Sequence, residues 1–137
     1  MKSYFLSIDF LLKIIGTILI ILFGLIPYKV LEMSDGGRAG SLKIVYSDLG
    51  VVIFYGLIVI MSIVFCFLKD RKPSLIINVV IVICLTMLFF IKKEFLNYPA
   101  VVGFNEKLSF GFYTHIISLI YYIFLFVFKF KRLKTSK

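Results

Sequence analysis

The sequence predicts an all-α membrane protein of a single domain, built as a bundle of four transmembrane helices. Of its 137 residues, 61% are apolar and 17% are charged, which leaves too little polar surface for a water-soluble fold. The runs Leu49–Leu68 and Ser74–Ile91 contain no charged residue, and each is long enough to cross a bilayer core, which takes about 20 helical residues. The turn between them, residues 69–73, is so short that the two runs are expected to form an antiparallel hairpin.

The cations around the spans predict the orientation of the chain. Cytoplasmic loops of membrane proteins carry an excess of Lys and Arg, and the turn 69–73 is rich in both. With this turn in the cytoplasm, both termini are also cytoplasmic, and ten of the 16 Lys and Arg residues lie inside against six outside. The Ile-, Phe- and Lys-rich composition suggests an AT-rich bacterial source, so we expect a multi-pass protein of the bacterial plasma (inner) membrane. The cations that determine this topology are Lys69, Arg71, Lys72, Lys129, Lys131 and Arg132.

The first span is predicted over residues 10–30. Asp9 and Lys13 stand one helical turn apart at its start, so they are expected to form an interfacial ion pair in which Lys13 reaches towards the lipid headgroups. An intramembrane relay is the alternative interpretation of this pair. Pro27 is expected to end or kink the helix near the far interface, because proline disrupts helical hydrogen bonding.

The two external loops, residues 31–48 and 92–107, are predicted to form a small extracytoplasmic cap. Ser41–Tyr46 alternates in part between polar and apolar residues and is rich in β-formers. The same residues are also compatible with the first turns of an extended second helix. If Ser41–Tyr46 is a strand, the apolar segment Ala100–Phe104 is its natural partner.

The second and third spans, residues 49–68 and 74–91, hold few polar groups. Asn78 lies about one turn inside the membrane, where a buried amide is expected to bond a neighbouring helix. Cys66 and Cys84 differ in predicted depth by roughly 12 Å, at 1.5 Å rise per residue, which is too far apart for a disulfide. We interpret both cysteines as apolar side chains that only contribute to packing.

The fourth span, residues 108–128, carries the residues most indicative of function and is followed by a basic cytoplasmic tail, residues 129–137. An ionisable group within a membrane, here His115, is a functional hypothesis by default. The alternative is a neutral imidazole bonded to a neighbouring helix through a backbone carbonyl or Tyr55. The candidate residues for helix packing or partner contact are Asn78, Gly111, Thr114, His115, Ser118, Tyr121 and Tyr122.

Several classes of chemistry are not indicated. The chain has one histidine, so a paired-histidine zinc site is excluded, and no nucleophile–base pair or phosphate-binding glycine loop occurs. We therefore expect no enzyme, no metal and no cofactor. The net charge of +9 is explained by clusters that flank spans and meet anionic headgroups of the lipid bilayer, and not by nucleic-acid binding.

Two classes of function remain. The first is a non-enzymatic accessory or interaction subunit of a larger membrane or envelope complex, including a toxin-immunity role, with the external loops as the specific surface. The second is a small homo-oligomeric channel or pore lined by the polar face of the fourth helix. A pore needs polar residues along its length, whereas the inner half of this helix is rich in Phe, so the first class is favoured.

Overall fold

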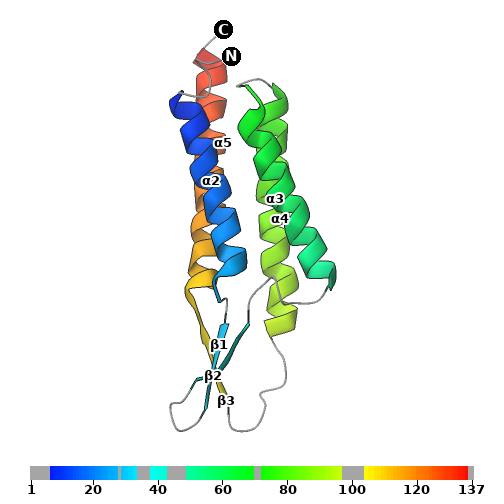
Figure 1. Cartoon of the computed structure of the whole chain (residues 1–137). Helices are drawn as coiled ribbons and strands as arrows, with labels where there is room; N and C mark the ends of the chain where they lie inside the picture. Colours follow the sequence, from blue (N-terminus) through cyan, green and yellow to red (C-terminus); the bar gives the residue numbers. More distant parts are fainter. Residues whose placement is uncertain are drawn as a thin grey trace.

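A computed structural model of the chain describes residues 7–27, 29–33, 38–42, 49–69, 72–96 and 104–135. Within them lie four long helices and three short strands (Figure 1). The helices are α2 (Ile8–Leu25), α3 (Leu49–Phe67), α4 (Lys72–Leu96) and α5 (Phe110–Thr135), and the strands are β1 (Lys29–Met33), β2 (Arg38–Leu42) and β3 (Phe104–Leu108).

The four helices form an up-and-down bundle. Each helix packs against two others, in the closed order α2, α3, α4, α5 and back to α2. The start of α2, the end of α3, the start of α4 and the end of α5 share one end of the bundle, and the strands lie beyond the other end (Figure 1). Short connections between consecutive helices favour such antiparallel neighbours.

All four helices are long and apolar enough to cross a membrane. The candidate spans are Ile8–Leu25, Leu49–Phe67, Lys72–Ile91 and Phe110–Arg132. Large apolar side chains cover the outside of the bundle, as at Ile53, where 57% of the residue is exposed. Such an apolar surface is suited to lipid and not to water, which supports a multi-pass membrane protein. The prediction of four helices long and apolar enough to span a membrane is confirmed.

The buried positions that face the bundle axis follow one rule in every helix: they recur at alternating intervals of four and three residues. This interval keeps one seam of each helix facing the bundle axis, as in coiled coils and four-helix bundles. Thr17, Gly24 and Cys66 are buried directly beside these positions. The seam positions are Asp9, Lys13, Gly16, Ile20 and Phe23 in α2; Val51, Tyr55, Ile58, Ser62 and Phe65 in α3; Ser74, Asn78, Ile81, Leu85 and Leu88 in α4; and Gly111, His115, Ser118, Tyr122, Leu125 and Lys129 in α5.

Helix α2 is shorter than its predicted range, which ran to Val30. Its first turn is capped by Ser7, whose hydroxyl accepts a hydrogen bond from the Phe10 N–H at 3.3 Å. At the other end Ile26 is extended, with φ −77° and ψ 143°. The ring of Pro27 disfavours a helical conformation in the residue before it. The helix therefore stops at Leu25, and the chain is free to enter β1.

Helices α4 and α5 extend beyond their predicted ends. Helix α4 runs to Leu96 and α5 to Thr135, so the residues predicted as a basic tail continue the last helix. Lys and Arg are good helix formers and are favoured in the last turns of a helix by its dipole. The described part of this segment is therefore an extension of the bundle and not a separate tail.

The strands form one sheet in the order β2-β1-β3, with both pairings antiparallel. Among the described strands, β2 and β3 each pair with β1 and not with each other. The predicted pairing of Ser41–Tyr46 with Ala100–Phe104 falls mostly on residues 43–46 and 100–103, which lie outside the described residues. Because α2 ends early, the segment after Pro27 becomes the central strand, which the sequence analysis had divided between helix and loop.

Candidate functional site

An ionic cluster lies inside the bundle at the end where α2 begins. Lys13 Nζ is 2.8 Å from Asp9 Oδ2, and Lys129 Nζ is 3.5 Å from Asp9 Oδ1. The exposed fractions are 6% for Asp9, 0% for Lys13 and 3% for Lys129. One carboxylate of α2 thus joins an ammonium group of its own helix to one of α5.

The same cluster reaches the other two helices. Lys13 Nζ donates to the carbonyl oxygen of Leu68, just after α3, at 2.6 Å. Lys129 Nζ donates to the hydroxyl of Ser74 in α4 at 3.0 Å. Both ammonium groups stand over the Phe65 ring, 5.2 Å and 4.3 Å from its centroid, a cation–π arrangement. All four helices are therefore tied together at this end.

This burial corrects two expectations. Lys13 does not reach towards headgroups, and Lys129 does not belong to a cytoplasmic tail, because both occupy seam positions. The carboxylate of Asp9 makes their burial tolerable, since a buried charge needs a partner and hydrogen bonds. Breaking such a buried pair costs about 3–5 kcal/mol. This arrangement is suited to holding the helix ends together.

A second polar group lies nearer the middle of the bundle. The Thr17 hydroxyl is 3.1 Å from the Lys13 carbonyl, 3.2 Å from the Ser62 carbonyl and 3.2 Å from Cys66 Sγ. The Tyr122 hydroxyl lies near the hydroxyls of Thr17 and Ser62. It does not meet the geometry of a hydrogen bond with any described residue. This group links α2, α3 and α5. Cys66 and Cys84 are not joined in a disulfide, in line with their predicted separation in depth.

The two mid-span tyrosines both face helix α2. The Tyr121 hydroxyl donates to the Leu12 carbonyl at 2.8 Å. The Tyr122 ring fits because α2 has glycine at position 16, where a Cβ would lie 3.0 Å from Cε2 of that ring. Both tyrosines were predicted as candidates for helix packing or partner contact. The structure places both within the chain.

His115 lies in the interior, 1% exposed, at the level of Phe23. Its Nε2 is 3.0 Å from the carbonyl oxygen of Leu85 in α4, and because a carbonyl only accepts, Nε2 carries a proton. The imidazole stacks on Phe23 at 4.6 Å with an angle of 14° and meets Phe89 edge-on at 6.1 Å. Of the partners considered for a His115 imidazole bonded to a neighbouring helix, the structure shows a backbone carbonyl and not Tyr55.

The rest of the predicted polar face of α5 is also used within the chain. Thr114 and Ser118 donate to carbonyls one turn back in α5, at 2.7 Å each. Gly111 is buried, and its N–H donates to the Pro27 carbonyl at 3.0 Å. A Cβ at this position would lie 2.7 Å from the Ile26 carbonyl oxygen. Glycine thus allows the start of α5 to touch the end of α2, directly above the sheet.

Asn78 is buried at the seam of α4, one turn further into the bundle than Ser74. Neither its amide nitrogen nor its oxygen has a hydrogen-bond partner among the described residues. The expected bond to a neighbouring helix is therefore not formed there.

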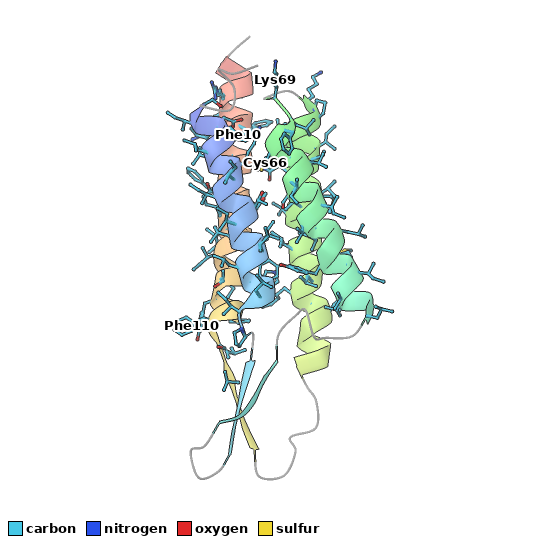
Figure 2. The ribbon with its side chains drawn as sticks, viewed as in Figure 1. Phe10, Cys66, Lys69 and Phe110 are labelled. Carbon is cyan, nitrogen blue, oxygen red and sulfur yellow. The ribbon has the colours of Figure 1, made fainter. Side chains whose placement is uncertain are left out.

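The cations that were predicted to determine the topology, other than Lys129, are not part of this buried set. Those described are exposed and lie at the bundle end opposite the sheet, where Figure 2 labels Lys69; Arg71 is outside the described residues. They are Lys69, Lys72, Lys131 and Arg132. Within the described ranges no group of three His, Cys, Asp or Glu residues is placed to hold a metal ion.

No protein-family model matches the chain, and neither does any curated protein or solved structure. The function is therefore argued from the geometry of the bundle and the sheet.

Proposed function

We propose that this chain is a non-enzymatic accessory or interaction subunit of a larger membrane or envelope complex, in which the sheet is the surface that meets the partner. The observation that carries the proposal is the sheet order β2-β1-β3, built from the connection after α2 and the connection before α5. An interacting subunit needs a specific surface outside the lipid, and this sheet extends beyond the helices at one end (Figure 1).

The sheet is suited to a partner because two of its strands are edges. In the described sheet, β2 and β3 each pair on one side only, with β1. An edge strand presents backbone N–H and C=O groups to which an extended segment of another protein can add. We infer that the partner binds by adding a strand at β2 or β3.

The base of the sheet is held to the bundle. The Gly111 N–H bonds the Pro27 carbonyl at 3.0 Å, directly where β1 leaves α2 and where β3 leads into α5. A rigid connection lowers the entropy cost of binding. This contact supports a role in which the bundle serves as an anchor and the sheet as the recognition element.

The orientation follows from the charges. Exposed cations cluster at the bundle end opposite the sheet, and Lys and Arg favour the cytoplasmic side. We therefore propose the bacterial inner membrane, both termini in the cytoplasm and the sheet outside. A toxin-immunity role belongs to the same class, since it uses the same external surface against an incoming protein.

The pore alternative receives less support. The polar face of α5 packs inside its own bundle, and the described seams around it carry fully buried apolar side chains such as Ile20, Ile58 and Leu125. Apolar side chains that close the interior oppose the passage of ions. A homo-oligomeric pore would have to be lined by the outer faces, which are apolar as well.

Site-specific photo-crosslinking tests the proposal. A photoreactive residue is placed at Arg38 in β2, at Asn105 in β3 or, as the control, at the lipid-exposed Ile60 of α3. In cells at native expression, the two sheet positions should crosslink to one membrane or envelope protein, and Ile60 should not. Crosslinks only between copies of this chain, with a homo-oligomer after mild detergent extraction, would refute the proposal and favour the pore.

A further inference from the structure

A groove of about 450 Å³ lies on the outside of the bundle, along the last turns of α5. It lies at the end opposite the sheet and is therefore separate from the surface proposed above for the partner. Its lining consists of Phe126, Val127, Phe130, Lys131 and Lys134.

The groove is divided into an apolar part and a cationic part. The rings of Phe126 and Phe130 stack at 6.0 Å with an angle of 26°, and Val127 adds to this apolar floor. Lys131 directly follows Phe130, and Lys134 lies one turn beyond that ring along the helix. The order along α5 is thus apolar towards the membrane and cationic towards the water.

The position of the groove matches the boundary of the membrane. The candidate span in α5 ends at Arg132, so Lys131 and Lys134 lie at its end, where headgroups are expected, and Phe126 and Val127 lie about one turn further into the span. Basic pockets at the cytoplasmic end of transmembrane helices are suited to anionic headgroups.

We propose that this groove binds one anionic phospholipid, with its phosphate at Lys131 and Lys134 and an acyl chain along Phe126, Val127 and Phe130. Charge complementarity and the apolar floor together favour a lipid. Free phosphate would not use the aromatic rings, and a neutral lipid would not need both lysines. The site differs from the diffuse attraction of a basic surface because one molecule occupies one place.

Native mass spectrometry of the purified full chain in detergent micelles tests the site, with added phosphatidylglycerol as the probe. The wild type should retain one phosphatidylglycerol per chain, and phosphatidylcholine at the same concentration should not be retained. K131A/K134A should weaken retention about thirtyfold, at about 1 kcal/mol for each lysine near the surface. The control K69A/K72A removes the same charge from exposed positions at the same end and should bind as the wild type does.

Three results would overturn the proposal. Equal losses in K131A/K134A and K69A/K72A would mean general surface attraction, and equal retention of phosphatidylcholine would mean that the lysines take no part. Displacement of the lipid by equimolar inorganic phosphate would assign the groove to the free ion. If K131A/K134A does not fold, Phe130→Ala decides the question. Because the Phe130 ring is exposed, its loss should weaken lipid retention without changing the bundle.

Discussion

Gly24 provides the sharpest test of how the bundle is packed. The Tyr55 side chain of α3 occupies the space that a Cβ at Gly24 would need, with its hydroxyl and ring carbons overlapping that position. This hydroxyl donates to the Ile20 carbonyl at 2.9 Å and lies 3.1 Å from that of Ile21. Gly24→Ala should therefore force the ring out of its site and break these contacts.

The expected loss can be worked out from three contributions. Overpacking of a dense core costs about 1–3 kcal/mol, and a lost interhelical hydrogen bond in a membrane costs about 0.6 kcal/mol. Alanine recovers about 1 kcal/mol because it is a better helix former than glycine. The net destabilisation is about 0.6–2.6 kcal/mol, which lowers the thermal midpoint by roughly 2–9 °C for a chain of this size.

Thermal unfolding can be followed with a maleimide dye that reacts with cysteine thiols as they become exposed. In a Cys84→Ala background the signal comes from Cys66, which is 6% exposed in the folded chain. The matched control is Gly56→Ala, because a Cβ there meets nothing within 4 Å and should leave the midpoint unchanged or higher.

A double-mutant cycle completes this test. In a Tyr55→Ala background the ring is absent, so Gly24→Ala should cost less than it does in the wild type. Equal midpoints for the Gly24 and Gly56 variants would refute the reasoning, and so would an equal cost with and without the tyrosine.

Three further predictions concern other parts of the fold. Gly111→Val should lower the same midpoint further than the substitution above, because a Cβ there would lie 2.7 Å from a backbone carbonyl oxygen, which cannot rotate away; an unchanged midpoint would mean that the junction opens without cost. Asp9→Asn should destabilise the chain by about 3 kcal/mol because it breaks a buried ion pair, and adding Lys13→Met should recover part of this loss; no recovery would contradict the pairing. Single cysteines at Asn105 and Lys134 should be labelled from opposite sides of the membrane, the first from outside; the reverse pattern would invert the proposed orientation.

The number and place of the spans could be predicted from the sequence because hydropathy is a local property. A run without charge, such as Leu49–Leu68, must avoid water whatever surrounds it, and the observed helix α3 follows that run closely, from Leu49 to Phe67. Prolines act locally too, and Pro27 was expected to end or kink its helix because its ring restricts the residue before it.

The inward-facing residues were harder to predict. In a helix of a soluble protein the apolar face is the buried one. A membrane helix is apolar on its lipid-facing side as well, so a difference in hydrophobicity between its faces does not show which face is buried. Asp9, Lys13 and Lys129 illustrate the consequence: each was assigned to an interface or a tail, and each lies on the buried seam. The alternating interval of four and three becomes visible only when the helices are packed together.

The sheet could not be predicted in detail for a related reason. Strand β1 pairs on one side with β2, which follows it directly, and on the other side with β3, which is distant along the chain. The pairing with β3 depends on α2 and α5 being held side by side by Gly111 and Pro27.

By itself, therefore, the sequence determined that this chain crosses a membrane through four helices, because the cost of placing charge in lipid acts on each segment separately. Only the tertiary structure decided which charges are buried, which tyrosines turn inward and which strand is central. These outcomes depend on neighbours that are distant in the chain, and the energy of a contact exists only once both partners are in place.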